Sequence, residues 1–470
     1  MNKTKIVCTI GPACANLQTI KEMMLAGMDV ARFNMSHGDH DSHRKLIGLV
    51  KQARFELGLP VAIMLDTRGP EIRIKQFKKG KINLKEGQSF ALTTEKVVGD
   101  DSIVSVTYDA LPEIVKKGTI ILLNDGLVEL LVTSKTKSVI HTEVIAGGEL
   151  SNNKSINLPN VELNMEYLSE EDKADIAFGV QEGVDAYSIS FVNHKEDVDC
   201  VKRYLKSIGE ESAFIIAKIE SAKGVENMRD IIEASDGVMV ARGDLGVEIA
   251  FEKLPHIQKE LLKTAKELGK YSITATQMLE SMITNIRPTR AEISDVANAI
   301  YDGTAAIMLS GETSAGNNPV LSVKTMQRIA DEAERTMDYK HGLPQYMPAD
   351  CVNCGIGYAA CSLATSLDAK AIIVTTTTGS SAENISRFRP HADIIAITPN
   401  IDVYFKLGML WGVTALLDKM YYDTDELLKS ARERAKQNNL VNVGDVVIQT
   451  AGIVTCVSGS NMLVVSEIEK

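Results

Sequence analysis

The stretch Phe214-Ile-Ile-Ala-Lys-Ile-Glu220, followed by Gly237-Val-Met-Val-Ala-Arg-Gly-Asp244, decides the fold of this chain. Each part is an apolar run that ends abruptly in charge, which is typical of a buried parallel strand at its C-terminal end. In barrels and open α/β sheets, ligands bind at that end. Glu220 and Asp244 can therefore share one hard divalent cation, Mg²⁺ or Mn²⁺. With Lys218 beside them and Gly243 leaving the backbone open, they suit phosphate or enolate chemistry.

Similar apolar runs recur along the chain and alternate with helical patterns. Eight are expected strands: Lys5–Thr9, Val30–Asn34, Val61–Asp66, Ala186–Ser190, Ile215–Ile219, Val238–Ala241, Ser272–Thr276 and Ala306–Ser310. Eight strands separated by helices favour a (β/α)8 TIM barrel over an open sheet of five or six strands. Their polar ends converge on one mouth, as an active site requires.

The alternation is interrupted once and resumes beyond a linker. Short, turn-punctuated segments from about Ile74 to Leu163 predict a small inserted β-barrel lid. The linker is expected from Tyr339 to about Ala349, and the βα alternation after it predicts a three-layer α/β domain. We therefore expect a barrel at residues 1–70 and 171–340, a lid at 71–170 and a C-terminal domain at 341–470.

The composition limits partners and location. A net charge of −11 argues against nonspecific nucleic-acid binding, so a phosphate substrate needs local cations. We expect no secretory signal and no membrane span, because no apolar run approaches ~20 residues. Seven cysteines, an odd count, favour a reduced, cytoplasmic protein. The Cys351-Val-Asn-Cys354 pair has the spacing of a zinc or redox site, but it opens an apolar helical run, so helix packing is favoured.

Nearly from end to end, the chain resembles the pyruvate kinase family, in its bacterial type without an extra C-terminal phosphohistidine-like domain. The motifs that carry the resemblance are Thr4–Pro12, Ala31-Arg-Phe-Asn-Met-Ser-His-Gly38, Leu65-Asp-Thr-Arg-Gly-Pro-Glu-Ile-Arg73, Ile216–Glu220, Met239–Glu248, Ala275–Met282, Arg287–Glu292 and Met308–Thr313. The resemblance implies a barrel, a β lid and an α/β domain. It also implies the glycolytic transfer of a phosphoryl group from phosphoenolpyruvate to ADP, which gives pyruvate and ATP.

The resemblance implies a role for each strand-end residue. Glu220 and Asp244 would hold Mg²⁺ or Mn²⁺. The expected catalytic residues are Lys218, Thr276, Ser310 and Arg73. The expected substrate-binding residues are Arg32, Lys218, Gly243, Asp244 and Thr276. The expected nucleotide-binding residues are Arg32, Asn34, His37 and Arg73. The expected K⁺ ligands are Asn34, Ser36, Asp66 and Thr67.

Several of these residues also have plain structural explanations. Arg73 and Glu71 can form a surface ion pair, and Thr276 and Ser310 can cap the helices that follow. Lys218 is harder to explain in this way, because a lysine in an apolar strand needs partners. In family members that do without K⁺, a lysine stands at the place of Glu71, so this chain is expected to depend on K⁺.

The chain departs from the family pattern mainly on the nucleotide side. Glu171 replaces a lysine that helps to hold nucleotide phosphates, and Asn124 replaces a lid acid. Asn193, Ala305 and Asn317–Asn318 also differ. These changes leave the metal and substrate residues intact, so activity is expected with altered nucleotide binding. The alternatives are a nucleotide-impaired regulatory paralogue, and a metal-dependent barrel lyase or aldolase acting on oxo-acids.

The C-terminal domain has a candidate effector loop. Thr376, Thr377, Thr378, Gly379 and Ser381 offer hydroxyls and amides where a helix begins, which suits a phosphate. The loop lacks the lysine of members that respond to fructose bisphosphate, and Gly452–Asn461 is one residue short. A sugar monophosphate or AMP is therefore the expected effector, and a plain capping loop is the alternative. The resemblance also implies a homotetramer.

Overall fold

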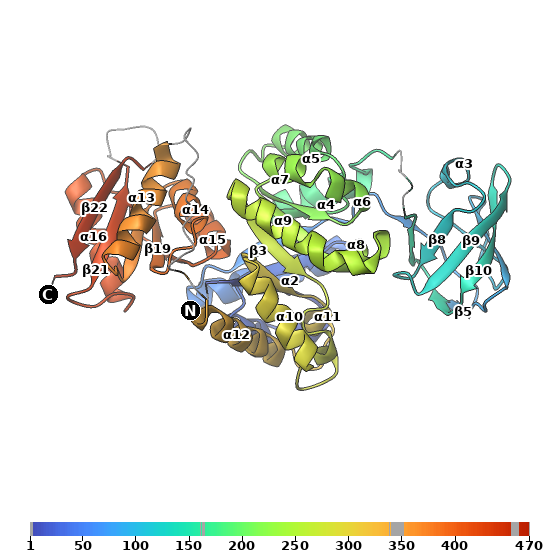
Figure 1. Ribbon diagram of the computed structural model, residues 1–470, viewed down its shortest axis with the longest axis horizontal. Coiled ribbons are helices and arrows are strands. Elements are labelled where there is room, and N and C mark those ends of the chain that lie inside the picture. The colour runs from blue at the N-terminus through green and yellow to red at the C-terminus, as the bar shows by residue number, and fades with distance from the viewer. Residues whose placement is uncertain are drawn as a thin grey trace.

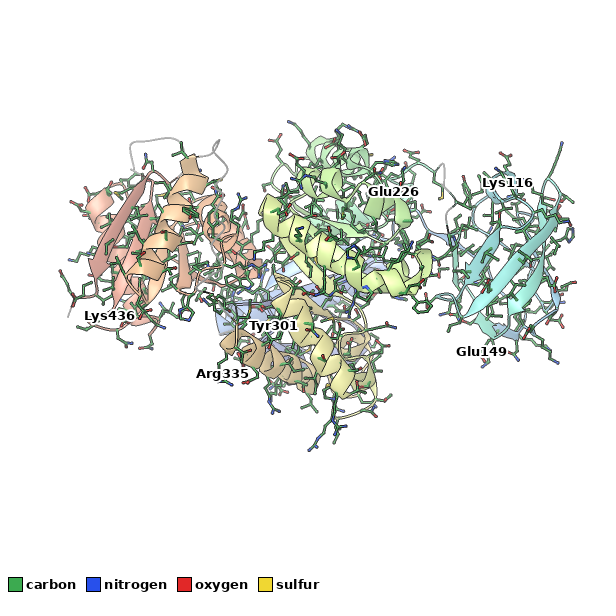
Figure 2. All side chains as sticks on the ribbon, viewed as in Figure 1. Lys116, Glu149, Glu226, Tyr301, Arg335 and Lys436 are labelled. Atoms are coloured by element: carbon green, nitrogen blue, oxygen red, sulfur yellow. The ribbon has the colours of Figure 1, made fainter. Side chains whose placement is uncertain are left out.

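The computed structural model describes residues 3–159, 161, 165–337, 339, 352–452 and 460–469. They form three bodies in a row, with the barrel in the middle and the lid and the C-terminal domain at opposite ends (Figure 1). Exposed side chains such as Lys116, Glu226 and Arg335 point outward from these bodies (Figure 2). The expected linker lies almost wholly outside the described residues, as do Cys351 and most of Gly452–Asn461.

The central body is a closed barrel of eight parallel strands, as predicted. In barrel order they are β1 (Lys5–Thr9), β17 (Ala306–Leu309), β16 (Tyr271–Ala275), β15 (Gly237–Ala241), β14 (Phe214–Ile219), β13 (Ala186–Ile189), β3 (Ala62–Asp66) and β2 (Val30–Asn34). The expected last residues Ser190, Thr276 and Ser310 each lie one position beyond the strand. Thr276 cannot continue β16, because its φ of 65° is left-handed.

Helices surround the barrel. The longer ones are α1 (Leu17–Leu25), α2 (His40–Leu57), α4 (Glu170–Gln181), α5 (Lys195–Ser207), α7 (Met228–Ala234), α9 (Leu254–Leu268), α10 (Arg290–Tyr301) and α12 (Pro319–Arg335). Their termini follow local chemistry. Thr289 and Glu292 form a capping box that begins α10. Gly269, with a φ of 67°, ends α9.

Side chains alternate along the barrel strands between two cores. In β1, Ile6 and Cys8 face the helices, whereas Val7 faces the barrel interior. The interior core also contains Met409 and Trp411 of the C-terminal domain, which lie against the end of the barrel where the strands begin. This packing leaves the opposite end of the barrel, where the strands finish, as the open mouth.

The lid has its own core and its own sheet. Seven strands pair in the order β4 (Ile72–Arg73), β12 (Ser155–Asn157), β8 (Ile120–Leu123), β9 (Val128–Lys135), β10 (Val139–Ala146), β6 (Ser89–Thr93) and β7 (Ile103–Ser105). A bridge between Ile74 and Val106 joins the two edges, so the sheet curls toward the predicted barrel. A two-stranded ribbon, β5 (Lys81–Asn83) and β11 (Glu149–Ser151), and the short helix α3 (Leu111–Ile114) complete it.

The C-terminal domain has the predicted three layers. Its sheet has the order β20 (Val413–Leu417), β19 (Asp393–Thr398), β18 (Ala371–Thr375), β21 (Val446–Ala451) and β22 (Met462–Glu467). One face packs on α13 (Val352–Ser366), α14 (Ser380–Ser386) and α15 (Ile401–Met409), and the other on α16 (Thr424–Gln437). Cys354 is buried in α13, which agrees with helix packing.

Across the described part of the chain, the helices are too short or too polar to span a bilayer.

Candidate active site

Lys218 lies at the centre of the barrel mouth, near the end of β14. Its Nζ is 3.1 Å from Asp66 Oδ1, 2.9 Å from Glu220 Oε1 and 2.7 Å from Ser190 Oγ. Burial alone would lower the pKa of the ammonium, but the Asp66 and Glu220 carboxylates outweigh it and raise the pKa above its usual value. Lys218 is therefore a permanent buried cation, as the sequence indicated.

Asp66 ends β3 and is fully buried between two cations. Its Oδ2 accepts a hydrogen bond of 2.6 Å from Arg32 Nε, and Arg32 is fixed further by Thr9 Oγ1 at 2.9 Å. Burial would raise the pKa of Asp66, but Arg32 and Lys218 together lower it. The Arg32 guanidinium is consequently held in one orientation at the barrel mouth.

Glu220 and Asp244 lie close enough for their charges to interact. Burial, with a contribution from Asp244, raises the pKa of Glu220 to about 8 although Lys218 opposes this. Glu220 Oε2 accepts a hydrogen bond from Phe191 N, whereas Oε1 has Lys218 beside it and no other partner among the described residues. In the part of the chain that the structure describes, no group of three or more His, Cys, Asp or Glu could hold a metal. Two carboxylates still fit Mg²⁺, which usually keeps water or substrate oxygens as its other ligands.

Asp244 and Gly243 belong to the short helix α8 (Arg242–Glu248), which follows β15. Arg242 ties this helix to the end of β16, because its guanidinium donates to the carbonyls of Ala275 and Thr276. Thr276 Oγ1 accepts a hydrogen bond of 2.9 Å from Gly243 N. The Gly243 amide and the Thr276 hydroxyl are thus brought together as predicted, but they are bonded to each other.

Ser310 follows β17, and its hydroxyl has no partner. The Ser310 amide donates to Glu312 Oε2 at 2.7 Å, while its Oγ is buried and unpaired among the described residues. The helix-cap explanation therefore fails for its side chain, which makes no cap hydrogen bond to α11 (Gly311–Ser314). Thr276 does not cap the helical turn that follows it in sequence; its hydroxyl instead accepts from Gly243 N in the first turn of α8 and donates to Ala275 O.

Arg73 lies on β4, where the lid begins, and is paired with Glu71. Its Nε and Nη2 are 2.7 Å and 2.5 Å from Glu71 Oε2. Burial raises the pKa of Glu71, although Arg73 opposes this. Burial, then Arg73 and Arg32, lower the pKa of His37, so both arginines lie near that ring.

Two of the four expected K⁺ ligands, Asn34 and Asp66, are the last residues of the adjacent strands β2 and β3, and the other two, Ser36 and Thr67, follow these strands. Asn34 and Asp66 are register partners of β2 and β3. Two of the four side-chain oxygens already have partners within the protein: Asn34 Oδ1 accepts from Ser36 N at 3.1 Å, and Thr67 Oγ1 accepts from Ser190 N at 3.2 Å. The oxygens are gathered near the mouth, while Asp66 is already shared by two cations.

Within the described part of the chain, none of three departures from the family pattern, Glu171, Asn124 and Asn193, forms a hydrogen bond or ion pair with Lys218, Glu220 or Asp244. Glu171 is exposed in the first turn of α4, where the helix dipole favours a carboxylate. Asn124 is at a lid turn with a φ of 54°, and its side chain donates to Glu149 O. The Asn193 side chain accepts a hydrogen bond from the Ser221 hydroxyl.

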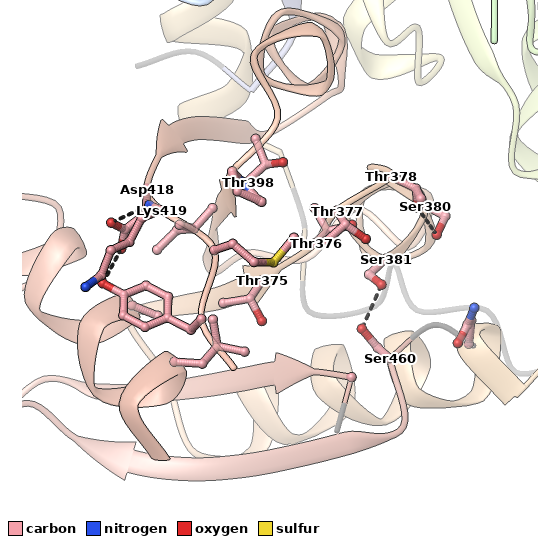
Figure 3. A pocket seen from close by; sticks show the side chains of 18 residues that line it. Thr375, Thr376, Thr377, Thr378, Ser380, Ser381, Thr398, Asp418, Lys419 and Ser460 are labelled. Atoms are coloured by element: carbon pink, nitrogen blue, oxygen red, sulfur yellow. Dashed lines mark hydrogen bonds between the residues drawn. The ribbon is translucent and has the colours of Figure 1, made fainter. Parts of the chain in front are cut away.

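A cavity of about 350 Å³ in the C-terminal domain contains most of the predicted effector loop. Figure 3 shows Thr376, Thr377, Thr378 and Ser381 along its wall. Thr376 Oγ1 accepts a hydrogen bond from Gly379 N at 2.9 Å, and Ser460 Oγ donates to Ser381 Oγ at 2.7 Å. The loop forms a concave, hydroxyl-rich surface.

The sequence reasoning missed residues at both sites. Ser190, which binds Lys218, had been noted only as a polar strand end. In the effector cavity, Lys419 and Tyr421 follow β20 and were not considered; the Lys419 ammonium lies 4.9 Å from the Tyr421 ring centroid. The signal was available, because β20 is a parallel neighbour of β19 and its end lies at the same edge of the sheet.

Comparison with known proteins gives a consistent result. Residues 1–323 match the family model "Pyruvate kinase, barrel domain", and residues 355–466 match "Pyruvate kinase, alpha/beta domain". A pyruvate kinase of Clostridium acetobutylicum is 44% identical over the full length of both chains. One from Bacillus licheniformis is 45% identical over 98% of this chain and 80% of its own length. The crystal structure of a pyruvate kinase from Cryptosporidium parvum, 36% identical, superimposes with a TM-score of 0.92 over 99% of this chain and 96% of that one.

Proposed function

Because this chain belongs to the pyruvate kinase family, we propose that the Lys218 cluster at its barrel mouth is where the phosphoryl group is transferred. The enzyme transfers the phosphoryl group of phosphoenolpyruvate to ADP and forms pyruvate and ATP. The observation that carries the proposal is the buried Lys218 ammonium, held 2.9–3.1 Å from two carboxylates. A lysine held in this way stabilises charge that develops during the reaction.

In the transfer, the bond between phosphorus and the enol oxygen breaks while a bond to a terminal oxygen of ADP forms. Lys218 neutralises the moving phosphoryl group and the enolate oxygen that is left. Arg32, fixed by Asp66 and Thr9, binds the phosphate oxygens from the barrel side. The enolate then takes a proton at its CH₂ carbon.

Glu220 and Asp244 would hold Mg²⁺ or Mn²⁺. The bound metal would supply positive charge to the substrate carboxylate and phosphoryl oxygens. The fit rests on the buried Glu220 carboxylate, whose Oε1 has no hydrogen-bond partner among the described residues besides the Lys218 ammonium, and whose pKa burial and Asp244 raise although Lys218 opposes them. The backbone amides of Gly243 and Asp244 and the Thr276 hydroxyl donate to the substrate carboxylate, which displaces the internal bond between the Gly243 amide and Thr276. Thr276 and the unpaired Ser310 hydroxyl organise the water that delivers the enolate proton.

The nucleotide side is proposed from residues nearer the lid. Arg73, Asn34 and His37 bind nucleotide phosphates with Arg32, and Arg73 exchanges its Glu71 partner for a phosphate. Asn34, Ser36, Asp66 and Thr67 hold K⁺. Since Glu71 stands where a lysine replaces K⁺, activity is expected to depend on K⁺. Full activity with Na⁺ or Tris as the only monovalent cation would contradict this.

The remaining proposals concern regulation and assembly. The loop of Thr376 to Ser381, joined by Lys419, binds a sugar monophosphate or AMP. Lys419 adds the cation that the loop itself lacks. The lid is bounded near residues 71 and 170 and the C-terminal domain begins near 341. The working form is a homotetramer.

The test of the site uses activity and metal binding together. Glu220→Gln should lower kcat by about 10²-fold or more, in a lactate-dehydrogenase-coupled assay with phosphoenolpyruvate, ADP, Mg²⁺ and K⁺. The same variant should weaken Mn²⁺ binding, measured by titration calorimetry, at least tenfold. Glu226→Gln, an exposed change on α6 (Ala222–Glu226), is the matched control. Unchanged Mn²⁺ binding in Glu220→Gln would remove the metal assignment.

A nucleotide-impaired regulatory role is the second candidate, because of Glu171 and Asn124. It predicts that Mn²⁺ and phosphoenolpyruvate bind while pyruvate is not formed at any ADP concentration. Formation of pyruvate at saturating ADP would exclude it.

A further inference from the structure

A second cavity, here called the seam cavity, lies where the C-terminal domain packs against the closed end of the barrel. Its volume is about 190 Å³. The barrel contributes residues at the starts of β14, β15 and β16, and the C-terminal domain contributes α14 and the loop that carries Trp411. It is therefore at the opposite end of the barrel from the phosphoryl-transfer site.

Four cationic side chains line the seam cavity, and among the described residues none of them forms an ion pair: Lys266, Lys270, Arg387 and Arg389. Lys270 Nζ donates to the carbonyls of Glu233 and Ser235. The Arg389 guanidinium donates to the carbonyls of Gly303 and Thr304 at 2.8 and 2.9 Å and lies 4.7 Å from the Trp411 ring centroid. Arg387 Nη1 donates to Cys354 Sγ at 3.7 Å, so Lys270, Arg387 and Arg389 are held by neutral groups only.

The only carboxylates in the described lining are Asp236 and Glu383. Asp236 Oδ2 is already used by the amide of Ile215 at 2.8 Å. Four cations therefore face two carboxylates in a partly dehydrated space. Unpaired like charges in such a space repel one another and favour an anion from solution.

Part of this positive charge has a structural purpose. Lys270 satisfies carbonyls where α7 ends, and Arg387 lies over the end of α9, since a Cβ at Gly269 would overlap its guanidinium. A cation at the C-terminus of a helix is stabilised by the helix dipole, so both positions are favourable for these side chains. Arg389 likewise satisfies two carbonyls just beyond the end of α10. Among the described residues, Lys266 has no such explanation. Burial, and then Arg389, lower the pKa of Lys266, and burial lowers the pKa of Arg389 to about 10.

A neutral donor lines the same cavity. Tyr271 is only 6% exposed, and its buried hydroxyl has no hydrogen-bond partner among the described residues. A buried hydroxyl left unpaired costs about 1–3 kcal/mol. An anion oxygen in the cavity would accept its proton and remove this cost.

We propose that the seam cavity binds a small, multiply charged anion of the size of inorganic phosphate or a short dicarboxylate. Lys266, Arg387 and Arg389 would surround it, and Tyr271 would donate the neutral hydrogen bond. The site is separate from the effector cavity, but α14 joins them: its first residues, Ser380 and Ser381, line the effector cavity, and Arg387, which follows its last residue, lines the seam cavity.

The test uses the only tryptophan of the chain, Trp411, as a local reporter. The intact enzyme is titrated with inorganic phosphate and, in a second arm, with malonate, while tryptophan emission is recorded. Potassium chloride at equal ionic strength is the blank. We expect a saturable change in emission with at least one of the two anions, and the arm with the lower apparent Kd identifies the class of ligand.

Variants separate this site from other anion sites. Lys266→Glu should raise the apparent Kd at least tenfold, whereas Lys263→Glu, the same charge change on α9 outside the cavity, should leave it unchanged. Arg387→Gln gives an independent loss if Lys266→Glu alters folding. An equal response in Lys266→Glu and Lys263→Glu would overturn the proposal. So would the absence of a saturable signal with either anion, or a signal lost in Ser381→Ala but kept in Lys266→Glu.

Discussion

Replacing Lys218 with methionine keeps an unbranched apolar stem as far as Cε and removes the ammonium between Asp66 and Glu220. At an effective dielectric constant of about 20, its contacts at 2.9 and 3.1 Å are each worth on the order of 5 kcal/mol before desolvation. Desolvation offsets much of this, and breaking a buried pair costs about 3–5 kcal/mol net. Because Arg32 stays 2.6 Å from Asp66, we expect the lower end, about 3 kcal/mol.

For a barrel of this size, that loss corresponds to a fall in melting temperature of roughly 6–12 °C. The activity should fall by about 10²–10³-fold in kcat, because one preorganised charge is lost from the transition state. Calorimetry and the coupled assay measure the two effects separately. Lys223→Met, which breaks an exposed pair with Glu226, is the control and should change neither.

The double variant Lys218→Met/Glu220→Gln distinguishes charge balance from catalysis. Removing the unpaired Glu220 charge should recover part of the lost thermal stability and none of the activity. If Lys218→Met melts within 2 °C of the parent, the buried charge network is wrong. If it keeps more than a tenth of the parent kcat, the catalytic role is wrong.

Three further predictions concern the nucleotide, substrate and effector sides. Glu171→Lys should lower the KM for ADP in the coupled assay, at a cost of about 0.3–1 kcal/mol in stability because an acidic residue leaves the first turn of α4; an unchanged or higher KM would refute it. Gly243→Ala should leave the melting temperature within about 2 °C, since its Cβ would meet Thr276 at an ordinary 3.6 Å, but raise the KM for phosphoenolpyruvate about tenfold; equal KM values would show that the substrate does not approach this backbone. Lys419→Gln should weaken AMP binding about tenfold in titration calorimetry and leave kcat without effector unchanged; equal affinity would exclude Lys419 from the effector site.

The barrel strands could be predicted closely, because apolar runs that end in charge have few other interpretations in a chain of this length. The predicted range for β1 was correct at both ends, and β16 differed by one residue because Thr276 adopts a left-handed backbone that no periodicity reports. The proximity of Lys218 to Glu220 could be predicted, because the two residues are two positions apart at the end of β14. The contacts of Lys218 with Asp66 and Ser190 depend on the pairing of β3 with β13 across the lid insertion and of β13 with β14, which no local sequence pattern reports.

The seam cavity could not be predicted from sequence patterns. The seam cavity joins residues from Phe214 to Trp411, and none of its charged residues belongs to a recognisable motif. Tyr271 begins an apolar strand and looks like an ordinary core residue until its unpaired hydroxyl is seen. Packing between domains, rather than local propensity, creates such sites.

The insertion of the lid also determines the order in which the enzyme can fold during synthesis. The lid strands end at Asn157, whereas β1 cannot pair with β17 until Leu309 has left the ribosome, about 150 residues later. At typical translation rates this interval lasts about 8–30 s. During it, a folded lid is tethered to an open sheet in which one side of β1 stays unpaired, while the other free edge moves from β3 to β13 and then to each strand added later. The nascent barrel therefore needs protection from aggregation during this interval.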